Sequence, residues 1–247
     1  MILRRLYGRV GVSSSMQKIS QGFAKRNLHE SLYGDPMTDT SRISDLDLAA
    51  LLCSRVCHDV ISPVGAIANG LELFDDPEMD EETKATALDM IRSSAKTAGA
   101  KLKFCRIAFG AAGTAGALID LSEAGEVARG FVGDEKVKLD WQAPRENRPK
   151  QQVKLLLNML LLAIAGIPRG GVVTVAANGD HLSVRAAGER AKISESLAEV
   201  LAGTADLTLL DARLVQPYYS KQLATSAGLK LTMAMDGDDV LVQANAA

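Results

Sequence analysis

A histidine, a carboxylate and a hydroxyl group lie close together in the segment CHDVISP, residues 57–63. Imidazole is a nucleophile near neutral pH, and an adjacent carboxylate such as Asp59 can orient the ring of His58 or favour one tautomer. Ser62 follows His58 by one helical turn and would share its face of a helix. Pro63 lacks an amide proton, and its ring would clash with the carbonyl of Asp59, so we expect a lost backbone hydrogen bond and a bend there.

A long helix is expected to carry this segment. Ser44 and Asp45 are good N-caps, and the helix is predicted to run to about Phe74. Apolar residues recur at alternating spacings of three and four and form a coiled-coil-like seam, namely Leu46, Ala49, Cys53, Val56, Val60, Pro63 or Val64, Ile67, Leu71 and Phe74. His58 projects roughly 200° from that seam, among small or polar residues, so it should be open to a partner. A lone exposed histidine on a helix is ordinary. A functional role for His58 is therefore indicated by its spacing to Ser62 and Pro63 together with the next helix.

A second helix is predicted from Asp80, as its N-cap, to about Phe109, with Gly110 ending it. It carries a similar apolar seam, namely Leu88, Ile91, Ala95, Ala98, Leu102, Cys105 and Phe109. Two amphipathic helices joined by a short loop form an antiparallel hairpin that cannot cover both seams, so we expect a homodimer with a four-helix bundle. The alternative is that the C-terminal region covers the seams within a monomer.

The rest of the chain shows a mixed pattern after a small-residue hinge predicted at 110–116. Helices are expected at 121–131, 151–167, 194–201 and 210–227, and strands at 137–141, 172–177, 182–186, 229–235 and 240–244. This order predicts an α+β sandwich with one sheet and helices on one face. The domain prediction is therefore a basic arm at 1–40, a helical hairpin at 41–112 and the sandwich at 117–247.

Two parts of this pattern resemble sensor histidine kinases. Residues 57–63 resemble their phosphoacceptor box, and the C-terminal order is similar to their ATP-binding domain. In that resemblance Asn158 is a kept nucleotide-site asparagine, whereas Leu162 replaces a second one, Ala186 replaces an adenine-reading aspartate and Arg190 replaces a glycine. Leucine cannot coordinate magnesium and alanine cannot accept a hydrogen bond from adenine. We therefore expect a degenerate ATP-binding domain without a bound cofactor or metal. An unrelated α+β domain is the alternative.

The combination resembles the bacterial histidine phosphotransferases of alphaproteobacterial cell-cycle phosphorelays, from about Ser44 to the C-terminus. The resemblance implies that His58 accepts a phosphoryl group from the receiver domain of a CckA-like hybrid kinase. It implies transfer onward to receiver aspartates of CtrA-like and CpdR-like response regulators, with magnesium held by the receiver. Asp59 would orient the ring, and Ser62 would be a polar neighbour or simply a solvated serine. Pro168 and Arg169 are candidate receiver contacts. The alternatives are an ATP-dependent histidine kinase with a divergent pocket and a non-enzymatic dimeric adaptor.

Composition narrows the function classes further. A net charge of −2 and a pI near 6.0 argue against a nucleic-acid binder. Three cysteines, with Cys53 and Cys57 one turn apart, are expected to be reduced thiols of a cytoplasmic protein. We expect no membrane partner, because the sequence is predicted to contain no transmembrane run. Six Lys or Arg residues precede Glu30, which is typical of a transit peptide. A disordered arm, or extra codons upstream of a true start at Met37, fits the bacterial interpretation better.

Overall fold

The structure of the 247-residue chain is a computed structural model that describes residues 42–110, 116–133 and 136–246. Residues 43–247 form one compact unit. The arm predicted at 1–40 and most of the hinge predicted at 110–116 lie outside the described residues. The three-part domain division therefore stays a prediction.

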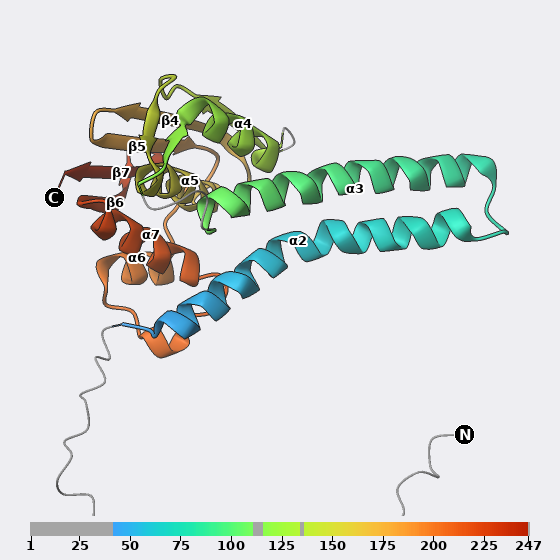
Figure 1. The fold of residues 1–247 in the computed structure, drawn as a ribbon, viewed down its shortest axis with the longest axis horizontal. Coiled ribbons are helices and arrows are strands. Elements are labelled where there is room, and N and C mark those ends of the chain that lie inside the picture. The colour runs from blue at the N-terminus through green and yellow to red at the C-terminus, as the bar shows by residue number, and fades with distance from the viewer. Residues whose placement is uncertain (1–41, 111–115, 134–135, 247) are drawn as a thin grey trace, which may run out of the picture. The chain divides into compact units, whose positions relative to one another are not determined.

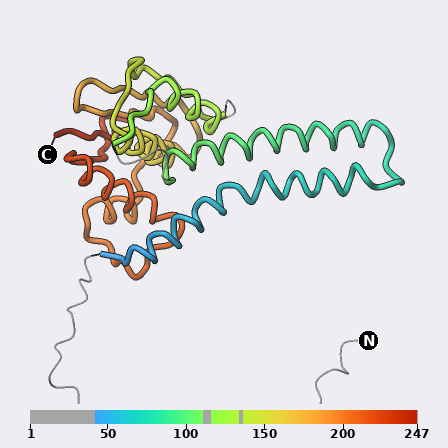
Figure 2. Tube along the Cα trace, viewed as in Figure 1, coloured from blue at the N-terminus to red at the C-terminus, as the bar shows by residue number. Residues whose placement is uncertain are grey.

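An antiparallel helical hairpin opens the described chain (Figure 1). Helix α2 spans Asp45–Asp75, and the Ser44 side chain caps it by accepting a hydrogen bond from the Asp47 amide at 3.1 Å. Helix α3 spans Glu81–Ala108, and Asp80 caps it by accepting from the Thr83 amide at 2.7 Å. Both predicted helices are confirmed to within a residue or two at their ends. In Figure 2 the two helices run side by side along the hairpin.

The two helices lie close together at Gly70. A Cβ atom at this position would lie 2.6 Å from Cγ1 of Ile91 and 3.3 Å from the carbonyl oxygen of Ala87. The first distance is well inside van der Waals contact, so the missing side chain lets α2 and α3 pack at this point. Gly70 and Pro63 are the buried residues of α2.

The C-terminal part is a two-layer α/β sandwich. Its sheet has the order β2-β4-β5-β7-β6, with β2 and β4 parallel and the other pairs antiparallel. The strands are β2 (Val137–Trp141), β4 (Gly171–Asn178), β5 (His181–Ala187), β6 (Leu229–Asp236) and β7 (Asp239–Ala246). The helices are α4 (Leu121–Val132), α5 (Lys150–Ala165), α6 (Glu195–Ala202) and α7 (Val215–Ser226).

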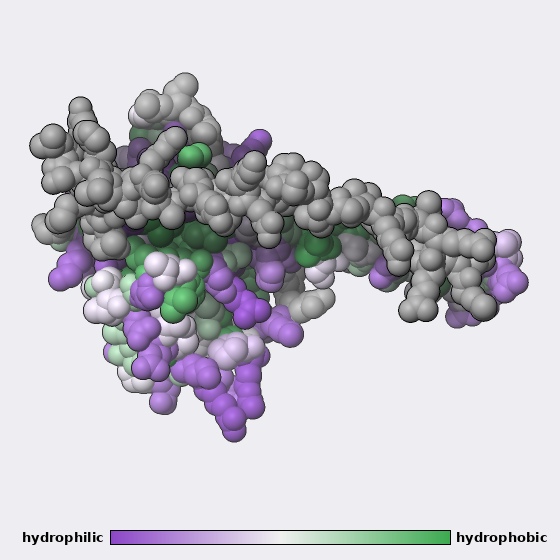
Figure 3. All heavy atoms as spheres, turned by 90° about the horizontal axis from the view of Figure 1, so that it is seen from below, coloured by the Kyte–Doolittle hydropathy of each residue, from purple (hydrophilic) through white to green (hydrophobic). Residues whose placement is uncertain are grey.

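The core lies between the sheet and its helices. Residues alternate between buried and partly exposed along β4, β5 and β7, which is typical of a sheet covered on one face. Helix α5 packs against these strands and contributes an almost continuous buried run, whereas α4 contacts β2 and α7 contacts β6. The part of the surface that Figure 3 shows in colour carries both hydrophobic and hydrophilic residues. The predicted one-faced sandwich is confirmed.

Two details differ from the sequence prediction. A small antiparallel sheet pairs β1 (Leu118–Asp120) with β3 (Asn147–Pro149), and neither strand was expected because each is only three residues long. The helix predicted at 210–227 starts at Val215 and follows a 3₁₀ turn, η2 (Leu207–Leu209). Asp211 accounts for the late start, because its carboxylate accepts hydrogen bonds from the amides of Arg213 and Leu214 at 2.8 and 2.9 Å.

Candidate functional site

The phosphoacceptor candidate His58 lies on the outer surface of α2. Its side chain is 62% exposed, and its Nδ1 atom is 3.4 Å from Oδ1 of Asp59. A neutral imidazole that donates from Nδ1 carries its free lone pair on Nε2. The arrangement therefore favours the tautomer in which Nε2 can act as a nucleophile toward a group arriving from solvent. The predicted open position of the histidine is confirmed.

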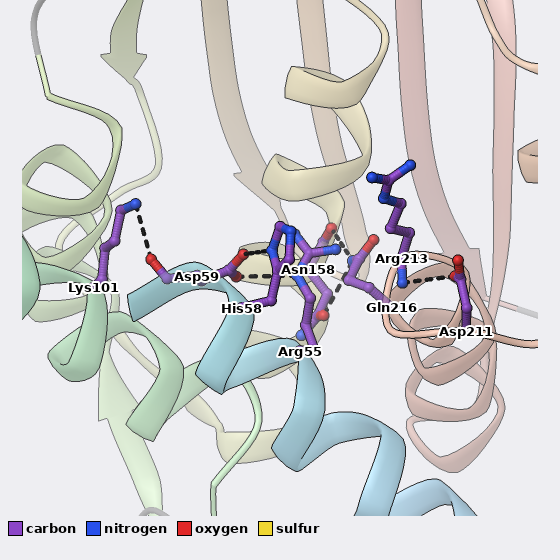
Figure 4. A network of polar contacts seen from close by, with 8 residues as sticks. All are labelled: Arg55, His58, Asp59, Lys101, Asn158, Asp211, Arg213 and Gln216. Atoms are coloured by element: carbon purple, nitrogen blue, oxygen red, sulfur yellow. Dashed lines mark hydrogen bonds and ion pairs between the residues drawn. The ribbon is translucent and has the colours of Figure 1, made fainter. Parts of the chain in front are cut away.

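Arg55 holds the other oxygen of the Asp59 carboxylate. The Nε atom of Arg55 is 3.0 Å from Oδ2 of Asp59, and the two side chains are 21% and 13% exposed. Asp59 therefore bridges an arginine one turn before it and the neighbouring imidazole, as Figure 4 shows. The sequence alone allows Arg55 to be either a solvated residue or a contact for a partner. Its spacing of four residues from Asp59 was the signal that could have identified the pair.

The backbone of Asp59 has an unusual partner because of Pro63. Pro63 is buried inside α2 and cannot donate to the Asp59 carbonyl, as an ordinary residue at that position would. Instead, the Nζ atom of Lys101 in α3 donates to this carbonyl oxygen at 3.0 Å. Helix α2 changes direction part-way along its length (Figure 1). The lost backbone hydrogen bond was expected, whereas the lysine that replaces it was not, because Lys101 is distant in sequence.

Ser62 is exposed and lies one turn after His58 on the same helix. Beside it, Ile61 is 70% exposed. The surface around the histidine thus combines a polar residue with an apolar one. A surface of this kind can bind a folded partner protein.

A buried thiol lies beneath this site. Cys105 of α3 is 5% exposed, whereas Cys53 and Cys57 of α2 are exposed. Burial raises the pKa of the Cys105 thiol to about 11, and the negative charge of Asp59 adds to the increase. Cys105 therefore stays protonated and unreactive at neutral pH.

The residues that resemble remnants of a nucleotide site lie inside the sandwich core. Asn158 is fully buried and donates from Nδ2 to the carbonyl oxygens of Ala108 and Lys154, at 3.0 and 2.9 Å. Its Oδ1 atom accepts from Nε2 of Gln216 at 3.1 Å. Leu162 and Ala186 are also fully buried. Asn158 therefore connects the end of α3 to α5 and α7, and its oxygen already has a donor.

Arg190 has a backbone conformation typical of glycine, the residue that the resemblance assigns to its position. Its φ angle is 58°, in the left-handed region that glycine adopts most readily. Arg169, a candidate receiver contact, forms an exposed ion pair with Glu189 at 2.7 Å. Within the described ranges, no group of three or more His, Cys, Asp or Glu side chains is placed to hold a metal ion.

Comparison with known proteins agrees with this architecture. Residues 121–239 match the family model of the histidine phosphotransferase C-terminal domain. The chain is 45% identical over 206 residues to protein phosphotransferase ChpT of Brucella abortus (strain 2308), which covers 82% of this chain and 97% of that protein. The chain belongs to the histidine phosphotransferase family. This phosphotransferase therefore acts in two-component phosphorelays, whose other members are kinases and response regulators.

One solved structure matches most of the chain. A bacterial phosphotransferase superimposes on this phosphotransferase with a TM-score of 0.74 at 42% identity, covering 83% of this chain and 98% of the other. A histidine kinase domain from Erythrobacter litoralis matches at a TM-score of 0.40 and 18% identity, over 74% of this chain and 94% of that domain. The predicted hairpin joined to an α/β sandwich is thus confirmed in a relative of known structure.

Proposed function

We propose that His58 is the residue that carries the phosphoryl group. The observation that supports this role is an exposed imidazole whose Nδ1 faces Asp59 and whose Nε2 has no partner among the residues that the structure describes. In the forward step the Nε2 lone pair attacks the phosphorus atom of a receiver's aspartyl phosphate. A nitrogen–phosphorus bond forms, the phosphorus–oxygen bond breaks, and the electron pair leaves with the receiver carboxylate.

Asp59 would stabilise the product of this step. The ring keeps its proton on Nδ1 and becomes positively charged when Nε2 is phosphorylated, and the carboxylate 3.4 Å away offsets that charge. Transfer to a second receiver reverses the same bond changes. Phosphoryl transfer requires mainly alignment and charge neutralisation, so the magnesium bound by each receiver would supply the remaining positive charge. Ser62 lies at the edge of this docking face and has no assigned chemical role.

The experiment that tests this proposal follows labelled phosphate from a phosphorylated receiver domain to the chain, beside a control with ATP alone. Label that arrives only from the receiver, and that is absent in His58→Ala, is the expected result. Label that arrives from ATP alone would favour the alternative of a histidine kinase with a divergent pocket. A His58→Ala protein that still supports signalling, with no label in the wild type, would favour the adaptor.

We propose that the chain forms a homodimer through its hairpin, with a four-helix bundle. In the single chain the sandwich leaves much of both seams uncovered: Leu46 is 83% exposed, Leu71 46% and Leu102 50%. An apolar groove of about 530 Å³ between α2 and α3 is also open. Its lining includes Ala49, Leu52, Cys53, Val56, Cys57, Leu102, Cys105 and Phe109. Apolar surface of this extent usually marks an interface.

Light scattering coupled to size-exclusion chromatography tests the dimer. The wild-type chain should have twice the monomer mass, and Leu102→Glu should shift it toward the monomer because a carboxylate would be buried between helices. Met235→Glu is a matched control, since Met235 is similarly exposed at 44% but lies on β6. A monomeric wild type, or equal effects of both substitutions, would contradict the proposed bundle.

We also propose that the chain binds no nucleotide and acts in the cytoplasm. The buried, hydrogen-bonded Asn158 and the buried apolar residues Leu162 and Ala186 support the first statement. By length and composition α2 could cross a membrane. It carries the Arg55–Asp59 ion pair and His58, however, and charged groups are costly in a bilayer. A CckA-like donor and CtrA-like and CpdR-like acceptors in cell-cycle control are the partners that the family resemblance favours.

A further inference from the structure

Lys101 makes a contact that links the two helices of the hairpin at the histidine. A residue at position 63 with an amide proton would donate to the carbonyl of Asp59, and Pro63 cannot. The ammonium of Lys101 donates to this oxygen at 3.0 Å across a sequence separation of 42 residues. A partly buried carbonyl without a donor is unfavourable, so the contact stabilises the interrupted helix.

We propose that Lys101 is a positioning residue for phosphoryl transfer, because it replaces the amide that Pro63 withholds and thereby fixes the backbone of Asp59. This inference rests on the proposed role of His58. It adds a residue of α3 to the residues that support phosphoryl transfer. The orientation of the His58 imidazole then depends on how α2 and α3 pack.

The geometry explains why both the backbone carbonyl and the side-chain carboxylate of Asp59 need a partner. Figure 4 shows Lys101 on one side of Asp59, bonded to the backbone carbonyl, and Arg55 and His58 on the other, bonded to the carboxylate. Arg55 holds the carboxylate but leaves the backbone free to shift at the proline. Lys101 restrains that shift, since hydrogen bonds from charged donors are short and strong. A displacement of about 1 Å at a reacting group can slow a reaction by roughly 100-fold, so a restrained backbone matters for transfer.

Lysine suits this position better than a shorter donor. Its flexible stem reaches from α3 to the neighbouring helix, and its three protons let one remain bonded to the carbonyl while the others contact water. Lys103, two residues later, is exposed and has no described contact with Asp59. The two lysines of the same helix therefore form a matched pair, in which only Lys101 is placed to restrain the site.

A cycle of Lys101→Met and Pro63→Ala tests the proposal directly. Alanine at position 63 restores an amide for the Asp59 carbonyl, so Lys101 should become dispensable in that background. In the wild-type background Lys101→Met should slow transfer from a phosphorylated receiver about tenfold, with the receiver concentration at half-maximal rate nearly unchanged. In the Pro63→Ala background the same substitution should change the rate by less than about threefold.

Three further measurements separate positioning from a loss of folding. Lys101→Arg should restore most of the rate because it keeps a charged donor, and Lys103→Met should leave the rate unchanged. Nitrogen NMR of the His58 ring should show a larger share of the Nε2-protonated tautomer in Lys101→Met than in the wild type. Urea unfolding shows whether each variant is folded at the assay temperature.

The outcomes that overturn the proposal are distinct from those that overturn the proposed function. Equal rate losses for Lys101→Met in both backgrounds, with His58→Ala inactive, would exclude the positioning role of Lys101. The proposed role of His58 would still stand. An unchanged His58 tautomer in Lys101→Met would exclude it as well. A His58→Ala protein with full transfer would overturn the proposed function, and the role of Lys101 would fall with it.

Discussion

Replacement of Asn158 by leucine should lower the stability of this phosphotransferase. It should have no effect through nucleotide binding, because we propose that the chain binds no nucleotide. Asn158 is fully buried, and its amide donates to the last residue of α3, Ala108, and accepts from Gln216 of α7. Leucine has a similar volume, so the substitution removes hydrogen bonds and creates little empty space. The Lys154 carbonyl lies inside α5 and keeps its helical partner.

The expected magnitude follows from the groups that lose a partner. The Ala108 carbonyl, at a helix end where carbonyls lack helical donors, loses the amide of Asn158. Gln216 loses one acceptor but still donates to the backbone oxygen of Asn158 at 2.9 Å and to Ser220 at 3.0 Å. A buried polar group without a partner costs about 1–3 kcal/mol. We therefore expect the free energy of unfolding to fall by about 1–3 kcal/mol, dominated by the Ala108 carbonyl.

Urea unfolding at one fixed protein concentration measures this change, because a dimer's stability depends on concentration. Asn158→Leu combined with Gln216→Met removes both partners and should cost less than the sum of the two single changes by about 1 kcal/mol or more. Magnesium and ATP should not shift the wild-type midpoint. A loss below about 0.5 kcal/mol in Asn158→Leu, or a midpoint raised by magnesium-ATP, would refute the interpretation of Asn158 as a structural residue.

Three other predictions test the hairpin. Asp59→Asn should slow receiver-to-histidine transfer by about tenfold or more, because an amide cannot offset the charge of a phosphorylated ring; an unchanged single-turnover rate would contradict this. Burial raises the pKa of Cys105 from its ordinary value of 9.0 to about 11 in the folded chain, so its contribution to stability is complete below pH 9 and is lost as the pH rises toward 11. Urea midpoints measured between pH 8 and 11 should fall less steeply in Cys105→Ala than in the wild type. Gly70→Ala should destabilise the chain by about 1–3 kcal/mol, whereas Gly99→Ala, whose added Cβ would have no heavy atom within 4 Å, should stabilise it by up to about 1 kcal/mol; thermal unfolding of the two variants in parallel separates packing from helix propensity.

Much of the hairpin could be predicted because its signals are local. The caps at Ser44 and Asp80, the two seams and the exposed face of His58 depend on residues within one or two helical turns. The strands were equally predictable where residues alternate and a turn separates them. The pair of strands at 118–120 and 147–149 was missed because three residues carry too little periodicity to be recognised.

The sequence by itself determined the elements and the candidate nucleophile, because periodicity, capping and the spacing of His58, Asp59 and Pro63 are properties of neighbouring residues. Only the tertiary structure showed that Lys101 replaces the donor missing at Pro63. It also showed that Asn158 is a buried link between α3, α5 and α7. Both contacts join residues far apart in the chain, and their existence depends on how packed helices place side-chain atoms within about 3 Å of each other, which no local pattern records.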